Sequence, residues 1–180
     1  KNHMQFILFP ESVSERIIIT AELPKGVSLK ENKRQIAQIE NLLIKSKKSE
    51  ISSFSTRIGM WADEIKTRMR DNWSVIYIDL TPYGKRKRVA REIVEELRIK
   101  VKKVKNFKSI NFNIVSGGPP VGRPIDIQIV GADDNLRNKL ALSVEQKLKS
   151  IKGVKDIEND QWPGKEEIQL LFNYEKLSRL

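Results

Sequence analysis

The stretch 73-WSVIYIDL-80 decides the predicted fold, because its side chains alternate between the two faces of a strand. One set is aliphatic and would pack against helices: Ile76, Ile78 and Leu80. The other set lies on the opposite face: Trp73, Val75 and Tyr77. This pattern is typical of a sheet with helices on one side, so we predict that the aromatic side chains lie on the uncovered face.

Strand and helix patterns surround this stretch in the order β-α-β-β-α-β. The predicted strands cover 16–24, 51–59, 73–80 and 109–115, and a helix covers 88–101. The other helix begins at Ser28, because Ser28 and Glu31 have the spacing of a capping box. Split β-α-β units of this kind form an antiparallel sheet with helices on one face, which is an α+β fold.

A second, incomplete unit follows the run 115-VSGGPPVGRPIDIQIVG-131. A strand pattern and not a helix follows the glycines, and a Walker lysine is missing, so the run is not a phosphate-binding loop. We interpret it as a connector: Gly117, Gly118, Pro119, Pro120 and Gly122. Beyond it the sequence predicts a strand at 124–130, a helix at 134–151, and strands near 153–159 and 166–173, a partial βαββ unit.

These patterns give the predicted domain boundaries. The first subdomain covers 6–116, the connector 117–123 and the partial second subdomain 124–180. Residues 1–5 include His3, the only histidine, and resemble a remnant of cloning.

Composition excludes several kinds of chemistry. The chain has 180 residues, a net charge of +11 and no cysteine, which excludes disulfides and thiolate metal sites. Without a usable histidine, zinc sites and His-assisted nucleophiles cannot form, and no pair of carboxylates is distinguished by its spacing. No apolar run approaches the ~20 residues of a membrane-spanning helix. We therefore expect a soluble chain that is not an enzyme and needs no cofactor.

The uncovered sheet face is the predicted binding surface. Its aromatic residues are Trp73 and Tyr77, and the corresponding positions of neighbouring strands are polar: Ser53, Ser55, Arg57, Asn111 and Asn113. Large aromatic groups among small polar ones are typical of an adaptable binding surface. The alternative, that the aromatic residues only pack beneath a loop or a neighbouring domain, stays open.

The segment 60-MWADEIKTRMRDN-72 is too long for a tight hairpin and is apolar for a surface loop. Its apolar residues are Met60, Trp61, Ile65 and Met69. Long loops of this kind often bind ligands, and methionine adapts to ligands of varied shape, so we predict a binding flap. The alternative is a disordered crossing loop with incidental apolar residues.

Several motifs together resemble the second large periplasmic loop of resistance-nodulation-division (RND) efflux transporters. They are "LPKGVS" at 23–28, "GGPPVGRPI" at 117–125 and "GVKDI" at 153–157, in the order found in that family. The resemblance extends from about Phe6 to Leu180 and implies a ferredoxin-like porter subdomain followed by the first half of another. It also implies a periplasmic fragment of a bacterial inner-membrane protein, in which a docking domain interrupts the second subdomain.

The resemblance also implies roles for particular residues. The connector would lie between two porter subdomains whose cleft admits substrate, 60–72 would be the switch loop, and Tyr77 would lie near a pocket aromatic. Heavy-metal relatives bind soft cations with three methionines, but those positions fall near Ile19, Trp73 and Ser116. The resemblance therefore favours the drug-exporting branch, with a hydrophobic or amphiphilic substrate, and leaves the heavy-metal branch as the alternative. The implied partners are a homotrimer, a periplasmic adaptor and an outer-membrane channel.

Nucleic-acid binding is a further alternative, because RNA-recognition domains share the β-α-β-β-α-β order. The basic runs 85–88 and 98–108 would contact phosphates. However, the fourth strand has Ser109, Asn111 and Asn113 where the RNA-binding signature requires aromatic residues. We therefore expect no nucleic-acid partner and interpret the basic runs as a solvated helix face.

Overall fold

The computed structural model describes residues 13–62, 67–115 and 125–159. The chain divides between Ile127 and Gln128 into two compact units. The predicted connector at 117–123 lies outside the described residues. Among the helices that are described, none is both long enough and apolar enough to cross a membrane.

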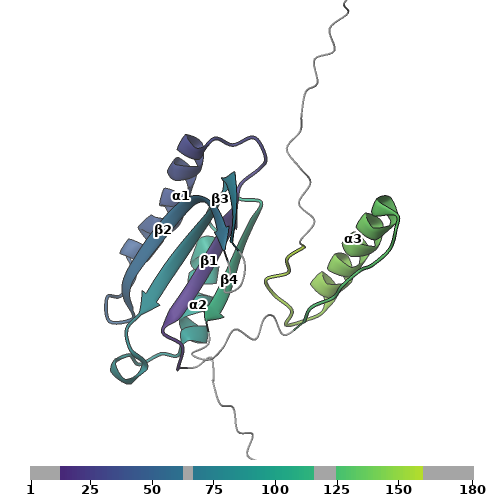
Figure 1. Cartoon of the computed structure of the whole chain (residues 1–180). Coiled ribbons are helices and arrows are strands. Elements are labelled where there is room, and N and C mark those ends of the chain that lie inside the picture. Colours follow the sequence, from purple (N-terminus) through teal and green to yellow (C-terminus); the bar gives the residue numbers. More distant parts are fainter. Residues whose placement is uncertain (1–12, 63–66, 116–124, 160–180) are drawn as a thin grey trace, which may run out of the picture. The chain divides into compact units, whose positions relative to one another are not determined.

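The described residues of the first unit form one sheet and two helices in the predicted β-α-β-β-α-β order. The elements are β1 (Arg16–Glu22), α1 (Leu29–Ile44), β2 (Ile51–Ala62), β3 (Thr67–Leu80), α2 (Ala90–Val101) and β4 (Ser109–Val115), with a short 3-10 turn at Tyr83–Lys85. The strands lie in the order β2-β3-β1-β4, and each neighbouring pair is antiparallel (Figure 1). The predicted element order and α+β class are confirmed.

Both helices pack on the same face of the sheet. The core between them contains the aliphatic positions of the strands and helices: Ile17, Ile19, Ile76, Ile78, Leu80, Ile36, Ile39, Leu43, Ile93, Val94 and Leu97. Helix α1 begins where predicted, because the Ser28 hydroxyl accepts a hydrogen bond from the Glu31 N–H at 3.3 Å. The Glu31 carboxylate does not complete the capping box and instead accepts hydrogen bonds from Arg34 and Gln35.

The predicted loop at 60–72 is wrong, because β2 continues to Ala62 and β3 already begins at Thr67. Beyond Ile58 the register changes: Ile58 lies opposite Ser74, but Met60 lies opposite Met69. Gly59 therefore stands opposite the whole segment 70–73, which bulges out of β3. Gly59 has a φ of 80°, a left-handed conformation that favours glycine. We call the end of the hairpin beyond this bulge, residues 60–62 and 67–69, the arm.

Asn32 of α1 holds the bulge in place. Its side-chain amide donates hydrogen bonds to the carbonyl oxygens of Asp71 at 2.6 Å and Trp73 at 2.8 Å. Its carbonyl oxygen accepts a hydrogen bond from the Ser74 hydroxyl at 2.7 Å. Asn32 is only 1% exposed, so these contacts satisfy backbone groups that water does not reach.

The other side of the bulge is attached to the segment that follows β1. The Asn72 amide donates a hydrogen bond to the Leu23 carbonyl at 2.8 Å, and the Leu23 N–H donates to the Asn72 carbonyl at 2.9 Å. The bulge is thus fixed both to α1 and to the end of β1.

A network of charged residues connects α2 to the start of β2. The Arg88 guanidinium donates two hydrogen bonds to the Glu50 carboxylate, at 2.7 and 2.5 Å, and also contacts Glu96 at 2.6 Å. Lys100 contacts Glu96 at 2.6 Å. The hydrogen bonds from Lys100 and Arg88 lower the pKa of Glu96 to about 2, and the hydrogen bond from Arg88 lowers the pKa of Glu50.

The second unit contains helix α3 (Asp134–Ser150), which agrees with the predicted helix at 134–151. Asp133 is its N-cap and accepts hydrogen bonds from the N–H groups of Asn135 and Leu136. The predicted strands at 124–130 and 153–159 are wrong for the described residues, which form no strand there, and 166–173 lies outside them. A strand needs a neighbouring strand to pair with, and the alternating isoleucines Ile125 and Ile127 remain more than half exposed, at 56% and 51%.

We expect Asn32→Ala to lower the free energy of unfolding by roughly 2–3 kcal/mol, because it leaves buried carbonyl and hydroxyl groups without partners. Asn41→Ala, at an exposed position of the same helix, is the matched control and should change stability by less than about 0.5 kcal/mol. Urea denaturation followed by circular dichroism measures both. Equal stability of the two variants would contradict the role of Asn32 as the anchor of the bulge.

The ion-pair network predicts a loss of stability in acid. A carboxyl group whose pKa is lowered by folding stabilises the fold above its unfolded pKa, here 4.5, and this stabilisation is lost as the pH falls through the folded pKa. The free energy of unfolding of the wild type should therefore fall between about pH 5 and pH 2. The free energy of unfolding of the Glu96→Gln variant should fall less steeply in that window. Thermal denaturation at a series of pH values tests this. Glu40→Gln, for which the described residues show no ion pair, is the control and should keep the wild-type slope.

Candidate functional site

The antiparallel register arranges the side chains of the helix-free face in rows across the four strands. One row is Ser55, Tyr77, Ile18 and Asn113. The next row is Arg57, Val75, Thr20 and Asn111. The fold therefore brings the predicted residues Ser55, Arg57, Tyr77, Asn111 and Asn113 together on one surface, which we call the open face.

A third row, nearer the C-terminal end of β3, contains polar residues that contact one another. Arg16 and Asp79 form an ion pair at 2.9 Å, and the Ser53 hydroxyl lies 3.1 Å from the Asp79 carboxylate. The predicted site residue Ser53 therefore contacts Asp79, and the charge of Asp79 is balanced by Arg16.

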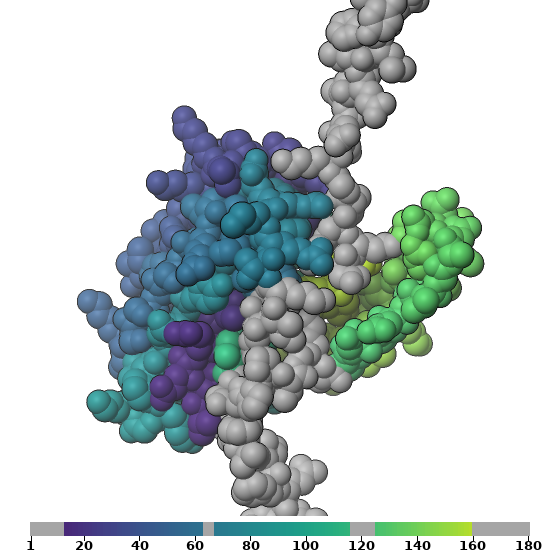
Figure 2. Space-filling view, in the orientation of Figure 1, coloured from purple at the N-terminus to yellow at the C-terminus, as the bar shows by residue number. Residues whose placement is uncertain are grey.

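The arm packs on part of the open face, so the prediction that this face is uncovered is wrong at Val75, whereas Ser55 and Arg57 stay exposed. Ala62 of the arm forms a buried cluster with Ile18 and Val75, and Met60 and Tyr77 pack against that cluster. Val75 is completely buried and Trp61 is 8% exposed. Figure 2 shows the blue-teal atoms of the hairpin beside the purple atoms of β1. The apolar floor of the open face is covered by the same hairpin that extends from it.

Trp73 differs from Tyr77 in its surroundings. Trp73 lies in the bulge, is 2% exposed, and has the Arg70 guanidinium 5.0 Å from its ring centre. Tyr77 is half-buried and has the Arg57 guanidinium 5.5 Å from its ring centre. Tyr77 therefore retains a surface that a ligand can contact, whereas Trp73 is packed within the protein.

The remaining predicted residues have different positions. Met60 and Met69 are cross-strand partners in the arm, but Met60 is half-buried and Met69 is 81% exposed. Ile65 lies outside the described residues, as do the connector residues Gly117, Gly118, Pro119, Pro120 and Gly122.

Sequence reasoning missed Ile18, Thr20 and Ala62 as parts of this surface. A signal for Ile18 was available, because 17-IIIT-20 does not alternate between apolar and polar residues. An apolar run without alternation is typical of a strand that is covered on both faces. Ala62 had no such signal, since its position depends on the bulge at Gly59.

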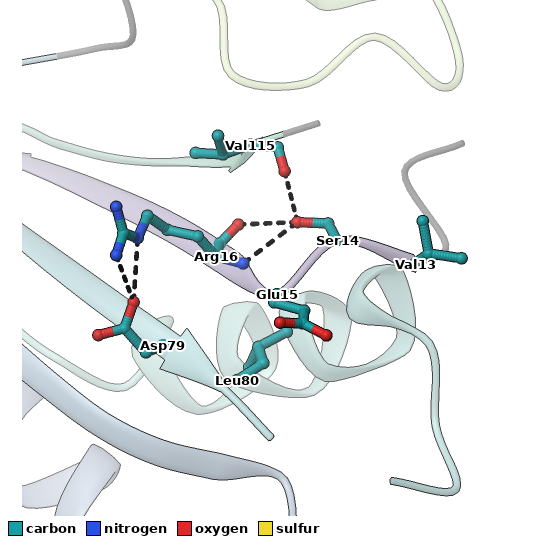
Figure 3. A pocket seen from close by; sticks show the side chains of 7 residues that line it. All are labelled: Val13, Ser14, Glu15, Arg16, Asp79, Leu80 and Val115. Carbon is teal, nitrogen blue, oxygen red and sulfur yellow. Dashed lines mark hydrogen bonds and ion pairs between the residues drawn. The ribbon is translucent and has the colours of Figure 1, made fainter. Parts of the chain in front are cut away.

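An open pocket of about 440 Å³ lies beside the third row, where β1 begins and β4 ends (Figure 3). The Ser14 hydroxyl donates to the Val115 carbonyl at 2.5 Å, and the Leu80 N–H donates to the Glu15 carbonyl at 2.7 Å. The polar groups of these four residues are therefore paired with one another at the end of the sheet, beside the pocket. The described residues contain no cluster of three or more His, Cys, Asp or Glu side chains that could hold a metal ion.

Comparison with known proteins places the chain in a family. A family model described as the AcrB/AcrD/AcrF family matches residues 4–180. A search of curated proteins gives no significant match.

Solved structures share the fold. The crystal structure of a heavy metal efflux pump, in crystal form II, superposes with a TM-score of 0.68 and 16% identity, over 95% of this chain and 18% of the pump. Crystal form I of a heavy metal efflux pump gives a TM-score of 0.63 and 16% identity, over 86% of this chain and 17% of that chain. This chain thus spans less than one fifth of those proteins, and the low identity shows a shared fold only. Because the family model covers almost its whole length, the chain belongs to the AcrB/AcrD/AcrF family, a family of RND transporters and not of enzymes.

Proposed function

We propose that this chain is part of the periplasmic porter region of a proton-driven RND efflux pump in a bacterial inner membrane, and that its open face contacts a hydrophobic or amphiphilic organic substrate. The observation that carries the proposal is the apolar floor of Ile18 and Val75, which is covered by an arm of the same hairpin. An apolar surface beneath a separate two-stranded arm can be exposed to a ligand without disturbing the main core.

The chemistry of the open face suits a ligand bound mainly by apolar area. Met60 and Tyr77 lie at the edge of the floor, and the thioether and the ring can adapt to ligands of different shape. The exposed Ser55 and Arg57 supply polar contacts at the rim. Trp73, buried in the bulge, would hold the arm and would not contact substrate directly.

The partners follow from the resemblance to RND transporters. We propose that the chain acts within a homotrimer with the rest of the transporter, a periplasmic adaptor and an outer-membrane channel. Exposed leucines of α3 need an apolar neighbour, which other parts of such an assembly would supply: Leu136, Leu140 and Leu142. The boundaries 6–116, 117–123 and 124–180 remain our proposed domain division.

A soft metal ion is the second candidate substrate. Met60 and Met69 lie opposite each other in the arm, and thioether sulfur binds Cu(I) and Ag(I). Met69 points into solvent at 81% exposure while Met60 packs against the floor, which favours an apolar role for Met60. We therefore place the organic substrate first.

Export by a transporter that contains this chain tests the proposal. Tyr77→Ala should reduce export of a bulky fluorescent amphiphile about 5- to 10-fold in a pump-deficient strain, because it removes an aromatic contact worth roughly 1–1.4 kcal/mol. Tyr83→Ala, at a 45% exposed tyrosine away from the open face, is the control and should export normally. Immunoblots must show equal protein levels. Normal export by Tyr77→Ala would refute the placement of substrate on this face.

Titration of the chain with Ag(I) tests the second candidate. If the arm does not bind metal, the wild type and the variant with Met60→Leu and Met69→Leu should give the same isothermal titration curve. Binding by the wild type that is lost in the double variant would favour the metal as substrate and contradict our choice.

A further inference from the structure

We propose that Arg57 makes the open face selective for anionic amphiphiles over cationic amphiphiles of the same size. This inference rests on the proposed function, because it assigns a substrate class to the same surface. Arg57 is an exposed residue beside the apolar floor.

The sheet register fixes Arg57 at the border between the rim and the floor. Arg57 lies directly opposite Val75 and diagonally from Tyr77, and its guanidinium carbon is 5.5 Å from the Tyr77 ring centre. Ser55 is two residues away on the same strand and therefore projects from the same face. A ligand on the floor would meet the guanidinium and a hydroxyl donor together.

Two acidic groups on the same face of the sheet as Arg57 are already paired. Asp79 contacts Arg16 at 2.9 Å, and Glu22 contacts Lys108 at 2.8 Å. Asp71 lies in the exposed part of the bulge, and the same hairpin carries Arg68 and Arg70. Among the described residues Arg57 forms no ion pair, and it is exposed at the rim.

This arrangement discriminates by charge in two ways. The Tyr77 ring already interacts with a guanidinium, so a cationic ligand would have to displace Arg57 or approach it against charge repulsion. A sulfate or carboxylate can instead accept paired hydrogen bonds from the planar guanidinium, which is weakly hydrated and loses little on desolvation. The alkyl part of the same molecule would then replace Ala62 of the arm on Ile18 and Val75.

Binding of three decyl amphiphiles to this chain tests the inference: decyl sulfate, decyl maltoside and decyltrimethylammonium, each as monomers. Amide chemical shifts locate the contact and give the dissociation constants. We expect decyl sulfate to bind the open face at least about 10-fold more tightly than decyltrimethylammonium, and Arg57→Gln to remove most of this difference. Arg57→Lys should retain part of it, because the charge stays while the planar fork is lost.

Lys33→Gln is the matched control, since it removes the same charge from an exposed position of α1. It should leave the preference for decyl sulfate unchanged within about 2-fold. An equal loss in Lys33→Gln and Arg57→Gln would show that only the net charge of +11 matters and would overturn the inference. If Arg57→Gln proved unstable, Arg57→Lys and the salt dependence of decyl sulfate binding would still decide the question.

The outcomes separate this inference from the proposed function. Equal binding of all three amphiphiles to the open face, unchanged in Arg57→Gln, would overturn the charge selectivity and leave the substrate surface in place. No shift of any open-face amide with any amphiphile would overturn both. Binding to anionic phospholipid vesicles that depends on Arg57, without binding of monomers, would assign the site to membrane lipid and also overturn the inference.

Discussion

Asn32 donates both hydrogens of its buried amide to the backbone of the β3 bulge, at 2.6 and 2.8 Å, and the position of the arm depends on this contact. A bulge leaves backbone carbonyls without ladder partners, and burying such groups unpaired costs about 1–3 kcal/mol each. Asn32 supplies the missing donors from α1 and accepts from Ser74. Asn32 therefore fixes the bulge from the helix layer, and the contacts between Leu23 and Asn72 fix it from the end of β1.

The arm gives the two faces of the sheet different kinds of cover. One face is buried by α1 and α2, which share a large apolar core, and separating them would unfold the unit. The other face has a small cluster in which Ala62 contacts Ile18 and Val75. Losing these few contacts costs far less than opening the main core, because the free energy of burial scales with apolar area. In our proposal, the open face is the place where a ligand competes with the arm for the same apolar surface.

The sequence was a good guide wherever structure depends on neighbouring residues. β4 has the predicted bounds Ser109–Val115, and Ser28 caps α1, because alternation and capping are local properties. The arm was not predictable from periodicity, since Gly59 lies opposite 70–73 and the alternation breaks there. The strand prediction for 124–130 was wrong for another reason. Alternation shows that a segment can form a strand, but a strand also needs the edge of a neighbouring strand to pair with. Among the site residues, the rows containing Tyr77 and Arg57 followed from alternation, whereas the burial of Trp73 depended on the bulge.

The distribution of charge bears on the nucleic-acid alternative. Several basic residues in and just before α2 are held in ion pairs on the helix layer: Arg88 with Glu50 and Glu96, Lys100 with Glu96, and Arg98 with Glu95. Binding of single-stranded RNA by a sheet requires aromatic rings that are free to stack on bases. Here Trp73 is 2% exposed and Tyr77 already contacts a guanidinium, so the rings and the basic runs do not form one surface. The positive charge of the helix layer is better explained as a solvated surface, and our proposal assigns a role in ligand binding to Arg57 on the opposite face.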